Sequence, residues 1–120
     1  MDLQAFQKRI EEIFGDQDRA RGPALSYLWF VEEVGELAEE LRHELRARAA
    51  GQASSAAEHQ DRQGRLEHEF GDVLAWLCTL ASMLDVDMAQ AARRYADGCP
   101  RCGGTPCVCA AARALDETSA

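Results

Sequence analysis

Apolar residues recur every three or four positions along much of the chain, the spacing that places side chains on one face of a helix. The first such series is Leu3, Phe6, Ile10, Ile13 and Phe14. It predicts a helix that ends at Gly15, and the charged segment 16–21 is expected to be a loop. Pro23 favours the start of a second helix, because its missing N–H is harmless in a first turn. This second helix is expected to run to about Arg48.

The stretch from about 65 to 84 is apolar over much of its circumference, which predicts the central and most buried helix of the fold. Asp87 followed by Gln90 resembles a capping box and predicts a short fourth helix. Between 49 and 64 the sequence lacks apolar periodicity, and we expect a flexible connection there. No alternating strand pattern occurs, so the chain is predicted to be all-α, with a four-helix bundle over residues 1–98.

The overall charge narrows the classes of partner. The chain has 120 residues, the size of one domain, and its 21 acidic against 13 basic residues give a net charge of -8. Without a stretch dense in lysine and arginine, neither nucleic acid nor an anionic membrane is an expected partner. The longest apolar run, 73–84, is too short to span a bilayer, and the N-terminal pattern is amphipathic. These features predict a cytoplasmic protein.

Four of the five cysteines lie close together near the C-terminal end, at Cys99, Cys102, Cys107 and Cys109. Glycine and proline residues between them favour tight turns, and this spacing of thiolates suits a tetrahedral Zn²⁺ ion. Because four protein ligands fill the zinc shell, the ion would be structural. The alternative is that these cysteines are incidental or oxidised. We therefore predict a zinc-binding knuckle over 99–109, followed by a tail over 110–120.

Two pairs of acids carry the candidate chemistry, Glu33 with Glu36 and Glu69 with Asp72. In a helix, residues three apart lie on one face, so each pair places two carboxylates together. Acids on the second helix fit an ordinary solvated face equally well. On the third helix, however, Glu69 and Asp72 fall within an apolar arc, where acids are rare unless they are paired or bind metal. Few cations are available to pair them, so the pattern favours a Mg²⁺ site.

The segments Glu32-Glu33-Val-Gly-Glu36 and Glu69-Phe-Gly-Asp72 resemble the EExxE…ExxD signature of the MazG-like all-α nucleoside triphosphate pyrophosphatases. The resemblance covers roughly residues 20 to 109. It implies Mg²⁺-dependent hydrolysis of an NTP or dNTP between the α and β phosphates, with a role in nucleotide-pool house-cleaning. Carried over by position, it also implies a set of Mg²⁺ ligands, Glu33, Glu36, Glu69 and Asp72, with Glu32 as a supporting catalytic acid.

Other residues are weaker candidates for the same site. Related enzymes often place a lysine on the last helix near the phosphates, and here Arg93 and Arg94 are the cations available there. Trp29 and Trp76 are candidates to stack on a base, although aromatic residues at helical spacing are more often part of the core.

Two further expectations concern assembly and the competing functions. Leu74, Cys78 and Ala81 are predicted to face away from the second helix and to need a partner surface, which predicts a homodimer. An alternative function is a zinc-stabilised helical interaction module without catalysis. A di-iron carboxylate bundle is excluded, because the single ExxH, Glu40 to His43, has no counterpart.

Overall fold

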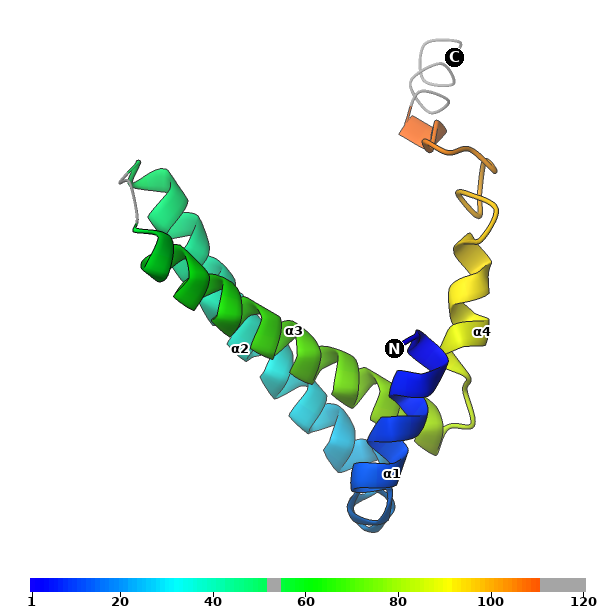
Figure 1. Ribbon diagram of the computed structural model, residues 1–120. Coiled ribbons are helices and arrows are strands. Elements are labelled where there is room, and N and C mark those ends of the chain that lie inside the picture. The colour runs from blue at the N-terminus through cyan, green and yellow to red at the C-terminus, as the bar shows by residue number, and fades with distance from the viewer. Residues whose placement is uncertain (52–54, 111–120) are drawn as a thin grey trace. The chain divides into compact units, whose positions relative to one another are not determined.

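The computed structural model describes residues 1–51 and 55–110. Its helices are α1 (Leu3–Arg21), α2 (Pro23–Ala49), α3 (Ala56–Met83), α4 (Met88–Ala92) and the 3₁₀ helix η1 (Arg93–Tyr95) (Figure 1). The described part contains no strand, which confirms the all-α prediction and the presence of four α-helices. The predicted tail lies, from 111 onward, outside the described residues.

The chain divides into two compact units, Met1–Val86 and Asp87–Ala120. The first holds α1, α2 and α3, whereas α4 and η1 belong to the second, together with the cysteine segment. Helix α4 has five residues, and none of them is buried. Whether α4 packs with the other three helices as one bundle over 1–98 stays a prediction.

Helix α1 is longer than predicted and continues through Gly15. The segment expected to be a charged loop is helical because its charges pair along the helix. The guanidinium of Arg19 lies 2.7 Å from the carboxylate of Asp16 and 3.7 Å from that of Glu11, so it spans the turn that contains Gly15. The helix ends at Arg21 because the next residue, Gly22, has a φ of 83°, a conformation that other residues rarely adopt.

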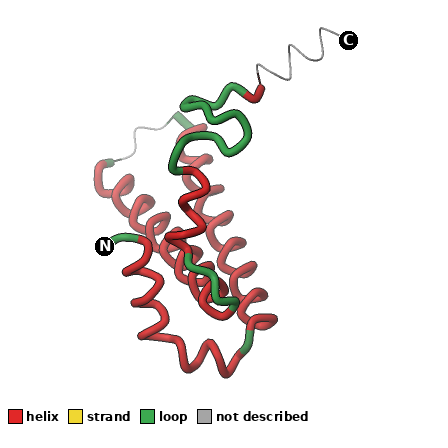
Figure 2. Tube along the Cα trace, turned by 90° about the vertical axis from the view of Figure 1, so that its right-hand side faces the viewer, coloured by secondary structure: helices red, strands yellow, loops and turns green. Residues whose placement is uncertain are grey.

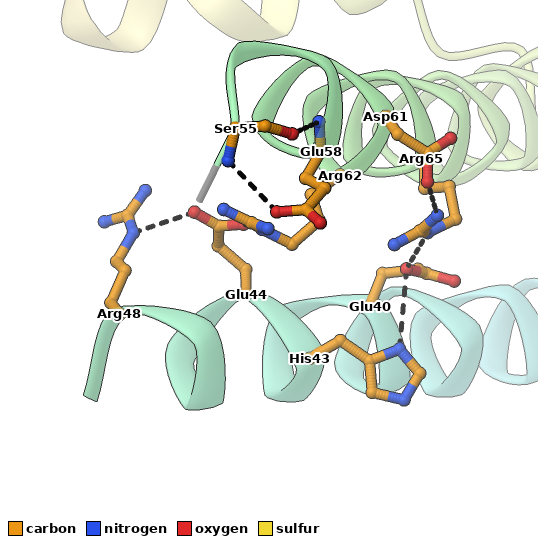
Figure 3. Close-up of polar contacts among 9 residues, drawn as sticks. All are labelled: Glu40, His43, Glu44, Arg48, Ser55, Glu58, Asp61, Arg62 and Arg65. Carbon is orange, nitrogen blue, oxygen red and sulfur yellow. Dashed lines mark hydrogen bonds and ion pairs between the residues drawn. The ribbon is translucent and has the colours of Figure 1, made fainter. Parts of the chain in front are cut away.

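Helix α3 begins earlier than predicted, so the expected connection over 49–64 is wrong from Ala56 onward. The start is fixed by a capping box (Figure 3). The hydroxyl of Ser55 accepts a hydrogen bond from the backbone N–H of Glu58 at 3.1 Å, and the Glu58 carboxylate accepts one from the Ser55 N–H at 3.0 Å. These bonds satisfy N–H groups that a helix start otherwise leaves unpaired. Residues 52–54 lie outside the described part.

Helices α2 and α3 run side by side, and α1 packs against both (Figures 1 and 2). The least exposed side chains of α2 recur at helical spacing: Ser26, Phe30, Glu33, Leu37, Glu40, Glu44 and Ala47. The predicted apolar face of α2 also included Val34, Leu41 and Leu45, but these three are exposed. The face of α2 that packs against the rest of the unit therefore carries glutamates, which need partners on α3.

Arginines on both helices supply those partners near the end of the α2 and α3 pair (Figure 3). Glu44 is buried, and its carboxylate accepts hydrogen bonds from Nε of Arg48 at 2.9 Å and Nε of Arg62 at 2.8 Å. These hydrogen bonds lower the pKa of Glu44. One turn away, Nε of Arg65 donates to Glu40 at 3.1 Å. Two glutamates of α2 are thus held by arginines of α3.

The small apolar core lies where α1 packs against α3 and comprises Ile10, Cys78 and Ala81. Beside it, the hydroxyl of Thr79 donates a hydrogen bond to the buried carboxylate of Asp18 at 3.0 Å. Of the three residues predicted to need a partner subunit, Cys78 and Ala81 are already buried within one chain, so the prediction is wrong for them, whereas Leu74 is exposed. Burial also raises the pKa of the Cys78 thiol.

Within the described residues, no helix combines the length and the apolar character needed to cross a bilayer.

Candidate functional site

Three carboxylates from two helices converge at one place in the first unit. Glu33 and Glu36 lie one turn apart on α2, and Glu69 lies on α3. One carboxylate oxygen of each residue lies within 4.8 Å of the corresponding oxygens of the other two. We call these three residues the acid cluster. The spacing within α2 follows from helix geometry, whereas the approach of Glu69 depends on the pairing of α2 with α3.

The acid cluster is electrostatically strained. Oε2 of Glu33 and Oε2 of Glu69 are buried, and neither has a hydrogen-bond partner. Burial raises the pKa of Glu33 to about 7, and its hydrogen bond with Glu36 and the charges of Glu36, Asp72 and Glu69 act in the same direction. Burial and the charge of Glu36 also raise the pKa of Glu69. Buried polar atoms are normally paired, and a cation bound by the three carboxylates could satisfy these two oxygens.

Asp72 lies beside the acid cluster but is not among its three members. Its charge contributes to the raised pKa of Glu33, so the two carboxylates are electrostatic neighbours. Oδ2 of Asp72 pairs with Nε2 of His68 at 3.2 Å, an interaction that the sequence analysis missed although the two residues are four apart on a helix. Glu32 is exposed on α2 and lies outside the cluster.

An aromatic stack lies next to these acids. The rings of Trp29 and Trp76 are 6.3 Å apart and nearly parallel, and the guanidinium of Arg21 lies 4.9 Å from the centre of the Trp76 ring. Trp29 is 46% exposed, so the interpretation of it as a core residue is wrong. A pocket of about 240 Å³ is lined by both Trp76 and Asp72. The sequence analysis missed Arg21 because it placed this residue in a loop.

The second unit contains the other predicted site. The four sulfur atoms of Cys99, Cys102, Cys107 and Cys109 all lie within 4.8 Å of one another. Hydrogen bonds from the backbone N–H groups of Val108 and Gly104 help to lower the pKa of Cys102 to about 6. Arg93 and Arg94 are exposed residues of η1 in the same unit. A contact between these arginines and a substrate stays a prediction.

Comparison with protein-family models matched residues 21–100 to the MazG nucleotide pyrophosphohydrolase domain. Comparisons with curated proteins and with solved structures gave no match. The matched region includes all of α2 and α3, and hence every acid of the EExxE…ExxD signature. It also covers more than half of the chain. The resemblance is therefore confirmed: the chain belongs to the MazG nucleotide pyrophosphohydrolase family, which implies a hydrolase with a nucleotide substrate.

Proposed function

We propose that the protein is a Mg²⁺-dependent nucleoside triphosphate pyrophosphohydrolase. It cleaves an NTP or dNTP between the α and β phosphates and releases a nucleoside monophosphate and pyrophosphate. The observation that carries the proposal is the acid cluster, in which three carboxylates from two helices converge and two buried oxygens have no hydrogen-bond partner. Membership of the family supplies the nucleotide substrate.

The donor set fits Mg²⁺, which prefers oxygen ligands and usually binds through carboxylates and substrate phosphates. Glu33, Glu36 and Glu69 would hold the ion directly, and Asp72 would be the fourth ligand. Glu32, one residue away from Glu33, would support the site as a further acid. When bound, Mg²⁺ would offset the charge of the triphosphate and polarise its oxygens. The four thiols of the second unit take no part, because thiolates suit zinc and carboxylates suit magnesium.

The stacked rings would contact the base of the nucleotide. Trp29 is exposed and nearly parallel to Trp76, so the pair offers a flat apolar surface next to Asp72. Stacking on aromatic rings tolerates every base, which fits a site that accepts several nucleotides.

The active form would be a homodimer. Exposed apolar residues of α2 recur every three or four positions, which places them on one face of the helix: Tyr27, Val31, Val34, Ala38, Leu41 and Leu45. We call this face the α2 stripe. Monomeric soluble proteins rarely expose so continuous an apolar surface, and a symmetric dimer is the commonest way to cover one.

We place the enzyme in the cytoplasm, with a role in nucleotide-pool house-cleaning and without nucleic-acid or membrane partners. The net charge of -8 supports the absence of nucleic-acid and anionic membrane partners, because it opposes binding to polyanions.

The proposal is tested with the purified full chain and a panel of NTPs and dNTPs, with and without Mg²⁺, by measuring pyrophosphate and phosphate separately. We expect pyrophosphate with Mg²⁺ and none with a chelator. Release of phosphate alone would place the cleavage at the other phosphoanhydride bond and contradict the proposal. A folded protein with no turnover on any nucleotide would favour the alternative function, a helical interaction module without catalysis.

A further inference from the structure

The described part of the C-terminal unit has almost no hydrophobic core. Of its described residues, 87–110, none is buried, and the large side chains of Tyr95 and Val108 are 66% and 53% exposed. Small folds without a sufficient core are usually stabilised by disulfides or by a metal ion. The segment nevertheless has a defined backbone with tight turns, so some other interaction must hold it.

The four sulfur atoms of this unit have the spacing of a mononuclear metal site. Sγ of Cys99 lies 3.7 Å from Sγ of Cys109, and Sγ of Cys102 lies 3.8 Å from Sγ of Cys107. A tetrahedron of sulfur atoms at the usual Zn–S distance of about 2.3 Å has edges of about 3.8 Å. All four sulfurs lie within 4.8 Å of one another, so a single ion can reach every one.

The same distances exclude two other arrangements for these thiols. A disulfide joins sulfurs at about 2.05 Å, and all four of these cysteines are free. An iron–sulfur cluster distributes its thiolates over several iron atoms, which requires wider separations than these.

The backbone from Cys99 to Gly104 forms a tight turn closed by two hydrogen bonds. The N–H of Gly103 donates to the carbonyl of Cys99 at 2.7 Å, and the N–H of Cys99 donates to the carbonyl of Gly104 at 3.0 Å. Gly98 has a φ of 113°, and a Cβ atom there would lie 2.8 Å from the Gly103 carbonyl oxygen. A side chain at this position would therefore disrupt the turn that brings Cys99 toward the other thiols.

Backbone N–H groups also point at the sulfurs. The N–H of Val108 donates to Sγ of Cys102 at 3.4 Å, and the N–H of Cys109 donates to Sγ of Cys107 at 3.4 Å. Four thiolates around Zn²⁺ leave a net charge of about -2, and donors of this kind offset it. Metal-binding thiolates are commonly supported in this way by a second layer of hydrogen bonds.

From these observations we infer that Cys99, Cys102, Cys107 and Cys109 bind one zinc ion as its four ligands, and that this ion replaces a hydrophobic core in holding the C-terminal unit folded. Zinc is the ion of choice because a complete set of four thiolates is typical of structural zinc sites. The zinc site shares no ligand with the acid cluster and has a different role. The inference therefore does not depend on the proposed catalytic function.

The test uses the full chain, prepared under reducing conditions without chelator, with metals measured by elemental analysis. We expect about one zinc per chain in the wild type, near zero in the Cys102→Ser, Cys107→Ser double variant, and an unchanged content in Cys78→Ala. Hydrogen exchange should show loss of protection in 87–110 of the double variant, while α1, α2 and α3 keep theirs. The Cys78→Ala control separates loss of a ligand from loss of any cysteine.

Several outcomes would overturn the inference. Iron in place of zinc, zinc far below one per chain in the wild type, or zinc retained by the double variant would each contradict the assignment of the ion. Protection in 87–110 that stays unchanged when zinc is lost would contradict its role in folding. Because none of these readouts measures turnover, failure here is distinguishable from failure of the proposed hydrolase function.

Discussion

The carboxylate of Glu33 lies in an environment that disfavours its ionised form. It lies close to Glu36 and Glu69, its Oε2 atom is buried without a hydrogen-bond partner, and its pKa is raised to about 7. Three like charges at this separation repel one another, and burial adds to the cost of ionising them. A cation would remove both costs at once, so the proposed function gives these mutually repelling residues a role as its ligands.

This arrangement predicts a specific pH dependence for the metal-free protein. The pKa of Glu33 is about 7 in the folded state against an ordinary value of 4.5, so the folded state binds more protons in this interval. The stability that Glu33 contributes is fully present below its unfolded pKa and is lost as the pH rises through its folded pKa. We expect the melting temperature in chelator to fall between about pH 5 and about pH 8.

In the Glu33→Gln variant the melting temperature in chelator should fall less steeply with rising pH, because glutamine does not titrate. Glu39→Gln is the matched control, since Glu39 is an exposed glutamate of α2 that pairs with Arg42. The control should keep the wild-type dependence of melting temperature on pH. An equal slope in Glu33→Gln and wild type would show that Glu33 is not the titrating group.

Only part of this site is predictable from the sequence. The spacing of Glu33 and Glu36 is fixed by helix geometry, and so it can be inferred from the sequence alone. The contacts of Arg21 with Trp76 and of Trp29 with Trp76 join different helices. They depend on where α1 ends and on how α2 meets α3, which periodicity does not specify.

At the scale of elements, local polar interactions decide boundaries that composition predicts wrongly. Gly15 and the charges after it favour a loop by composition, yet the ion pairs of Arg19 extend α1 to Arg21. The polar start of α3 also resembles a loop by composition. The Ser55 and Glu58 capping box marks the true start of this helix. The first turns of α3 lack apolar periodicity because they pair with α2 through charged residues, so the sequence pattern does not predict them as helix.

We therefore expect Ser55→Ala to lower the free energy of unfolding by about 1 kcal/mol, the usual loss for an N-terminal cap. Chemical denaturation measures it. Glu58→Gln should be close to wild type, because glutamine can make the same return hydrogen bond in a capping box. If Ser55→Ala is as stable as wild type, the capping box does not fix the start of α3.

At the scale of the whole molecule, the exposed apolar residues of the first unit are the main unexplained feature. The α2 stripe faces solvent in a single chain, and Phe70 of α3 is also exposed. The sequence analysis expected a partner surface on α3 at Cys78 and Ala81, but α1 packs against this region. A dimer can be proposed from the apolar pattern of the sequence, whereas the face it uses depends on the order in which the helices pack.

Light scattering at high micromolar concentration should give a dimer for the wild type. Leu45→Glu, in the α2 stripe, should shift the protein toward monomer, because it places a charge in the apolar interface. Ile13→Glu is the matched control, since Ile13 of α1 is 52% exposed and Leu45 is 53% exposed. A wild-type monomer, or a Leu45→Glu variant that remains dimeric, would count against the α2 stripe as the interface.

The central claim is that the acid cluster binds the catalytic metal, and pyrophosphate release by Glu36→Gln tests it most directly. Loss of a residue that merely supports a metal ligand costs 10-fold to 100-fold, so loss of a ligand should lower turnover by at least about 100-fold. The helical fold should persist, and Mg²⁺ should raise the melting temperature of the wild type more than that of the variant. Glu39→Gln, on the same helix but outside the cluster, should keep wild-type turnover. A Glu36→Gln protein with near-wild-type pyrophosphate release at low millimolar Mg²⁺ would contradict the account.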